Sequence, residues 1–103
     1  MTIVTQTVIH PKPGADWDAL QKQLKKGNEI VQKHGGENVT TMVGMASGPE
    51  TGTLSIISTC ADWTTYGKVQ EAMMADPELQ AMMADANSPV ASWDTYVSMT
   101  LDL

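Results

Sequence analysis

The tripeptide Ala15-Asp16-Trp17 returns as Ala61-Asp62-Trp63, and this repetition decides the fold. Each copy directly follows a run rich in β-branched residues and directly precedes a run with helical spacing. The chain therefore predicts two strand-then-helix units, the pattern of a βαβ arrangement used twice. This repetition identifies a scaffold and names neither a reaction nor a substrate.

The first unit is predicted to be a strand over residues 3–10 and a helix that begins near Asp16. The run Pro11-Lys12-Pro13-Gly14 ends the strand, because proline lacks a backbone donor and glycine permits a turn. Apolar residues then recur at helical spacing, with lysines on the other faces. Asp16 is the expected cap of this helix and Gly35-Gly36 its expected stop.

Two further strands are predicted at residues 39–46 and 53–60, around a cluster of turn residues of the size that closes a β-hairpin. A second helix begins near residue 63 and should break at Asp76-Pro77, because proline cannot donate the backbone hydrogen bond that continues a helix. With Asp76 as cap and Pro77 in the first position, the helix can restart. We therefore expect a bent or split second helix.

The last run, residues 92–103, alternates between two kinds of side chain, as a half-buried strand does. One side carries Trp93, Thr95, Val97, Met99, Leu101 and Leu103. The other side carries Ser92, Asp94, Tyr96, Ser98, Thr100 and Asp102. The order βαββαβ with right-handed crossovers predicts a ferredoxin-like α+β fold, a four-stranded antiparallel sheet with both helices on one face. Residues 1–103 are expected to form this single domain.

The second face of this sheet has no cover of its own. The first three strands carry apolar residues at both parities, as in Met42-Val43 and Ile56-Ile57, so an open face would leave an apolar patch in water. A second copy of the chain is the simplest cover, and we expect a homodimer. Its interface is expected to include the apolar side chains of the last strand, namely Val97, Met99, Leu101 and Leu103.

Composition argues against several classes of partner. The formal net charge of −6 disfavours a nucleic-acid partner, because binding to phosphates relies on Lys and Arg. No stretch approaches the roughly 18 apolar residues that a membrane span needs, and the first residues lack the pattern of a signal peptide. One cysteine, Cys60, allows no internal disulfide. We expect a cytoplasmic protein without a membrane partner.

The chain resembles the dimeric α+β barrel superfamily, which includes NIPSNAP-like and antibiotic biosynthesis monooxygenase-like proteins. The resemblance lies in the runs Thr59-Cys60-Ala61-Asp62-Trp63-Thr64-Thr65-Tyr66-Gly67, Ala75-Asp76-Pro77-Glu78-Leu79-Gln80 and Lys12-Pro13-Gly14-Ala15-Asp16. It covers nearly the whole chain in order, but its motifs are turn and helix-start signals, so it implies a fold far more than an activity. In that superfamily two sheets face each other in a dimer, and ligands lie between sheet and helices or inside the barrel.

The resemblance also implies where catalytic residues would be. Haem-degrading and cofactor-independent oxygenase members rely on an asparagine in the first strand and a tryptophan at the end of the third. This chain has Thr7 and Cys60 at those places, and Trp63 lies three residues later, where it suits packing at a helix start. The haem enzymes add a histidine in the second helix, and the second helix predicted here contains none. We therefore expect no haem and no other cofactor.

The candidate acid or base residues are Asp94 and His10. Tyr96 is a polar neighbour of Asp94 on the last strand. Asp94 and Tyr96 share one side of the last strand, and in a low-dielectric cavity the pKa of Asp94 would rise enough for it to act as a base. The alternation with Ser98 and its neighbours instead favours a side that faces solvent, where both would be ordinary polar residues. His10 and His34 are the only histidines, too isolated for a metal site.

The eight methionines include two adjacent pairs. Thioethers can bind Cu(I), but methionine more often fills irregular cores and adaptable pockets, and no Cys or His cluster accompanies these residues. We therefore expect no metal site. Cys60 likewise suits a small buried apolar group better than a nucleophile.

Two functions stay open from the sequence. The favoured one is a non-catalytic dimeric binding or structural module for a small apolar metabolite, because the catalytic positions of the superfamily are substituted. The alternative is a cofactor-independent monooxygenase-like or isomerase-like enzyme, with Asp94 or His10 as acid or base. In either case the expected ligand pocket includes Thr7, Cys60, Tyr66 and Tyr96, together with methionines.

Overall fold

The computed structural model describes residues 1–103, apart from the side chain of Glu50. Its elements are, in order, β1 (Ile3–Pro11), α1 (Trp17–Lys33), β2 (Glu37–Val43), the short 3₁₀ helix η1 (Gly48–Glu50), β3 (Leu54–Cys60), α2 (Trp63–Met74), α3 (Pro77–Ala84) and β4 (Val90–Met99). This is the predicted βαββαβ order, with the second helix split at the predicted place.

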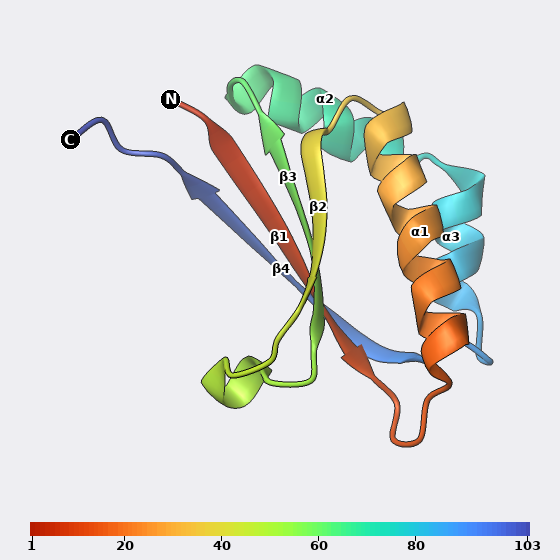
Figure 1. Ribbon diagram of the computed structural model, residues 1–103. Coiled ribbons are helices and arrows are strands. Elements are labelled where there is room, and N and C mark those ends of the chain that lie inside the picture. The colour runs from red at the N-terminus through yellow and green to blue at the C-terminus, as the bar shows by residue number, and fades with distance from the viewer.

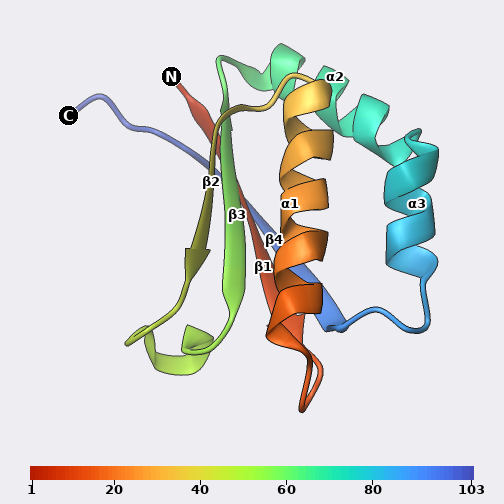
Figure 2. The same ribbon diagram turned by 45° about the vertical axis from the view of Figure 1, so that its right-hand side comes forward.

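The four strands form one antiparallel sheet in the order β2-β3-β1-β4. The two strand-helix-strand units therefore interleave, with β1 and β3 side by side in the centre. All three helices lie on the same face of the sheet (Figures 1 and 2), and η1 curls toward the opposite face (Figure 1). The predicted ferredoxin-like fold is confirmed.

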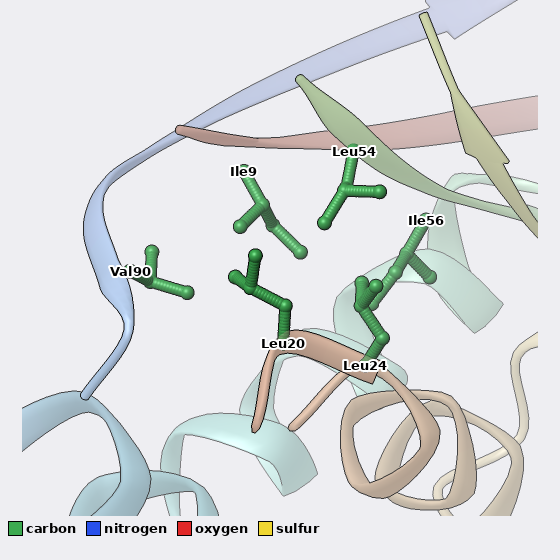
Figure 3. Packing of buried hydrophobic residues seen from close by; sticks show 6 residues of the cluster. All are labelled: Ile9, Leu20, Leu24, Leu54, Ile56 and Val90. Atoms are coloured by element: carbon green, nitrogen blue, oxygen red, sulfur yellow. The ribbon is translucent and has the colours of Figure 1, made fainter. Parts of the chain in front are cut away.

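The main core lies between α1 and the sheet. Leu20 and Leu24 are one helical turn apart, so both face the sheet, and they are 4% and 6% exposed. Figure 3 shows them pointing at residues of three strands, and the full cluster is Ile9, Leu20, Leu24, Leu54, Ile56 and Val90. Each such side chain contributes roughly 1.5–3 kcal/mol when fully buried. This cluster fixes α1 over the sheet.

A smaller core lies under α2. Ile3, Cys60 and Val69 are buried there, and Tyr66 and Met73 pack against them. Ile3 and Cys60 are paired across β1 and β3, so this cluster holds α2 over the far end of the central strands. The space between the two cores is left for the cavity described below.

Asp76 organises the break between α2 and α3. Its Oδ1 accepts hydrogen bonds from the backbone N–H groups of Glu78 and Leu79 at 2.8 and 3.2 Å, which caps α3. Its Oδ2 lies 2.6 Å from Nε2 of His34, the residue that directly follows α1. The hydrogen bond with His34, together with these backbone donors and the charge of Lys33, lowers the pKa of Asp76 to about 2. This buried carboxylate therefore ties α3 to the end of α1.

The clearest differences from the prediction concern β2, β4 and the cap of α1. β2 is shifted and spans Glu37–Val43, and the link from Gly44 through Thr53 completes the hairpin with backbone bonds and η1. β4 begins at Val90 and ends at Met99, so residues 100–103 are not part of the strand. Asp16 is in the cap position of α1 but makes no side-chain capping bond, whereas Asp62 accepts one from the N–H of Thr65 at 2.7 Å.

Candidate functional site

A cavity of about 170 Å³ lies between the sheet and the helices. Its floor is formed by three strands through Thr5, Thr7, Ile56, Ser58, Cys60, Trp93 and Thr95. Its walls and roof are formed by the helices through Gly27, Val31, Val69, Gln70, Met73, Met74, Leu79, Met82 and Met83. The cavity therefore draws on six of the elements and combines an apolar roof with a floor that carries several hydroxyl groups.

Strand periodicity determines which side chains reach the floor. Side chains two residues apart share a face, so Thr5, Thr7 and Ile9 all point toward the helices. Thr5 pairs with Ser58 of β3, and Thr7 pairs with Thr95 of β4. The helix-facing rows of β1, β3 and β4 thus bring their hydroxyls next to one another.

The roof is loosely built. Among the described residues of α3, none is buried, and the helix stands apart from the sheet in Figure 2. The adjacent methionines divide their roles: Met73 and Met82 are half-buried, whereas Met74 and Met83 are 65% and 53% exposed. Flexible thioether side chains can adapt to the shape of a bound molecule. This roof can therefore adapt to a bound molecule more readily than a rigid core could.

Cys60, the last residue of β3, lies at one end of the floor and is 4% exposed. Burial raises the pKa of its thiol, and the negative charges of Glu37 and Asp62 raise it further. A thiol with a raised pKa is a poor nucleophile, since the thiolate is the reactive form. Cys60 therefore behaves as a small apolar group in the wall of the cavity.

His10 and Asp94, the two candidate catalytic residues, form a pair on the other face of the sheet. His10 Nε2 lies 2.8 Å from Asp94 Oδ2, and the two side chains are 32% and 55% exposed. Val8 is opposite Asp94 in the β1–β4 pairing, and its row faces away from the helices. The structure thus brings the two candidates together, but outside the cavity.

The four expected pocket residues divide between the two faces. Thr7 and Cys60 line the cavity. Tyr66 packs beside it, against the cluster of Ile3, Cys60 and Val69, and contacts the ring of Trp63 edge-on at 5.8 Å between centroids. Tyr96 is 51% exposed and lies with Asp94 on the face of the sheet that points away from the helices, called the open face below. A role in ligand binding stays a prediction for all four.

Sequence reasoning missed three hydroxyl groups on the floor, those of Thr5, Ser58 and Thr95. The available signal was the alternation Thr5-x-Thr7, which puts two hydroxyls on one side of the first strand. Ser58 and Thr95 join them only through the pairing register, which the sequence does not display.

Other kinds of site find little support in the part of the chain that the structure describes. Among the described residues, no group of three or more His, Cys, Asp or Glu residues is placed to hold a metal ion. No helix within the described residues is both long and apolar enough to cross a membrane.

No protein-family model matches this chain, and no curated protein matches it in sequence. Solved structures do match. A NIPSNAP family protein of unknown function from Agrobacterium tumefaciens has a TM-score of 0.72 at 17% identity, covering 94% of this chain and 86% of that one. An uncharacterised NIPSNAP-like domain protein from Burkholderia xenovorans has a TM-score of 0.74 at 11% identity, covering 97% and 85%.

A Dabb family protein with a ferredoxin-like fold from Mesorhizobium loti also matches, with a TM-score of 0.66 at 16% identity, covering 99% of this chain and 100% of that one. At these identities the likeness concerns the fold. The chain has the same fold as these NIPSNAP and Dabb family proteins.

Proposed function

We propose that this protein is a homodimeric, non-catalytic binding module that holds a small apolar metabolite in the cavity between its sheet and its helices. The observation that carries this proposal is the cavity itself, with its methionine-rich roof and its floor on β1, β3 and β4. Pockets for small molecules are typically concave and apolar with a few placed polar groups. The proposal treats residues 1–103 as one domain.

The dimeric part of the proposal is supported by the shape of the chain. The molecule measures 41 × 34 × 17 Å, so it is only two layers thick, and one face of the sheet is covered by no α-helix. Its surface of 6433 Å² exceeds the roughly 5,700 Å² expected for a compact monomer of this mass. The excess of roughly 700 Å² is close to one partner's share of a standard interface.

The open face carries the side chains that such a partner would cover. Met42 and Tyr96 are 45% and 51% exposed there, and Ile57 is half-buried. Val97 and Met99 lie near the end of β4 on the helix-facing row, beyond the cover of the helices, and are 38% and 51% exposed. A second copy that covers the open face and this strand end would remove both groups from water.

The enzymatic alternative rests on one observation, the His10–Asp94 pair. A carboxylate 2.8 Å from an imidazole nitrogen can orient a general base. In a face-to-face dimer this pair would be enclosed between two sheets, where a monooxygenase-like or isomerase-like reaction would be screened from water. We favour the binding module because the cavity is on the other side of the sheet from this pair.

Native mass spectrometry of freshly purified protein tests the proposal, because it reports the oligomer and any retained small molecule together. We expect a dimer, and a retained apolar molecule at up to one per chain. Val31→Phe narrows the cavity and should reduce the bound fraction. Val43→Phe enlarges a valine outside the cavity and should leave the bound fraction unchanged. A monomer, or equal retention in both variants, would contradict the proposal.

The remaining expectations stay predictions from composition: a cytoplasmic location, no membrane partner and no nucleic-acid partner. Retention of a nucleotide-containing polymer or of phospholipid in the same spectra would count against the two expectations about partners.

A further inference from the structure

The floor of the cavity carries hydroxyl groups in two cross-strand pairs, Thr5 with Ser58 and Thr7 with Thr95. The pair Thr5–Ser58 is the more deeply placed, since these residues are only 9% and 8% exposed. All four side chains lie on the helix-facing side of three adjacent strands. A bound molecule therefore meets a row of hydroxyls on one side and thioethers on the other.

These hydroxyls are not used by the fold. Within the described residues, none of the four makes a side-chain hydrogen bond, whereas Ser55 on the opposite face of β3 accepts one from Gln6. A hydroxyl that makes no bond within the protein can donate to or accept from a bound molecule that reaches it. Thr5 and Ser58 are thus free to bond a ligand.

The lining contains no charged side chain among the residues that the structure describes. A bound carboxylate or ammonium group would lose its hydration without gaining an opposite charge, which is strongly unfavourable. A neutral oxygen, by contrast, needs only a hydroxyl partner, and a hydroxyl can either donate to it or accept from it. The chemistry of the floor selects a neutral, oxygen-bearing ligand.

The size of the cavity limits the rest of the ligand. Its volume is about 170 Å³, close to that of an engineered apolar protein cavity of about 150 Å³ that binds benzene. The methionine sulfurs of the roof make favourable contacts with aromatic rings. One ring with few substituents fits this space and these walls.

We propose that the cavity binds a neutral single-ring compound with one hydroxyl or carbonyl oxygen, which is hydrogen-bonded by Thr5 and Ser58 while the ring lies against the methionines. This inference rests on the proposed function and names the ligand class of the same cavity. It adds a polar contact that a purely apolar site would lack.

The test compares three probes of similar shape, p-cresol, toluene and 4-methylbenzoate, by calorimetry on the full-length protein at pH 7. We expect p-cresol to bind roughly tenfold more tightly than toluene, because one net hydrogen bond is worth about one order of magnitude in affinity. The ionised benzoate should bind more weakly than either.

In the double variant Thr5→Val/Ser58→Ala the preference for p-cresol over toluene should disappear, while toluene still binds. Ser98→Ala removes an exposed hydroxyl on the open face and should leave the preference intact. The ratio of two affinities within one protein is insensitive to a general loss of stability, and Ser58→Ala alone provides the same comparison if the double variant does not fold.

The outcomes separate the two proposals. Equal binding of p-cresol and toluene, tightest binding of 4-methylbenzoate, or a preference that survives the double variant would overturn the hydroxyl contact and leave the apolar cavity standing. Failure of both toluene and p-cresol to bind at millimolar concentration would overturn the proposed function and this inference together.

Discussion

Replacing Tyr96 by alanine should weaken the proposed dimer far more than it weakens the fold. Tyr96 lies on the open face and is 51% exposed, which leaves roughly 100 Å² of a tyrosine side chain available to a partner. At about 25 cal/mol per Å², complete burial of this area stabilises the dimer by roughly 2.5 kcal/mol per copy. A symmetric interface counts the side chain twice, so the total is roughly 5 kcal/mol.

This magnitude sets the expected result. Even if the interface covers only half of the exposed area, the dissociation constant should rise by roughly two orders of magnitude. Sedimentation velocity over a range of concentrations measures it directly. Trp17→Ala is the matched control, because Trp17 is 50% exposed but lies at the start of α1 in the helical layer.

Two results would refute the reasoning about the open face. One is a dissociation constant that changes less than about fivefold in Tyr96→Ala, since even partial burial of this side chain predicts more. The other is an equal effect in Trp17→Ala, which would show that the partner binds elsewhere.

Three further outcomes follow from single residues. Gly36→Ala should lower the free energy of unfolding in urea by about 1–3 kcal/mol, because a methyl group there overlaps Cγ1 of Val31; an unchanged urea midpoint would contradict this. The pKa of Asp76 is lowered to about 2 by its hydrogen bond with His34, so its stabilisation is present above the unfolded pKa near 4 and is lost as the pH falls toward about 2. Between pH 6 and pH 2, the urea midpoint of Asp76→Asn should fall less steeply with decreasing pH than that of the unmodified protein. Parallel profiles would count against the contact between His34 and Asp76. Cys60 should react with iodoacetamide much more slowly in the native protein than in urea, since burial raises the pKa of its thiol.

Local patterns in the sequence were enough to predict the fold. Alternation and helical spacing specify the elements, and Asp76-Pro77 specifies the break between α2 and α3, because a cap and a proline act within one turn. The end of β4 could not be predicted in the same way. Alternation continues to Leu103, but Met99 already pairs with Ile3 at the start of β1, so the residues beyond it have almost no neighbouring strand to bond.

The site was harder to predict because it depends on register. Thr7 and Cys60 were expected in the pocket and do line the cavity, but Thr5 and Ser58 come together only because β1 and β3 pair in one particular register. The contact between His34 and Asp76 likewise joins the end of α1 to the start of α3, and neither helix signals it alone. Tertiary pairing, rather than local preference, decides these positions.

The sheet separates two sets of polar groups, and this separation makes the two candidate functions experimentally distinct. The hydroxyls of Thr5 and Ser58 face the helices of their own chain, so the cavity is built by one copy. The His10–Asp94 pair faces the side where a second copy is proposed, so any chemistry there depends on the dimer. Tyr96→Ala at concentrations below its dissociation constant should therefore still bind p-cresol, whereas a reaction that uses His10 should be lost on dissociation. Loss of p-cresol binding in the dissociated variant would mean that the partner completes the cavity, against the proposal that each chain holds its own ligand.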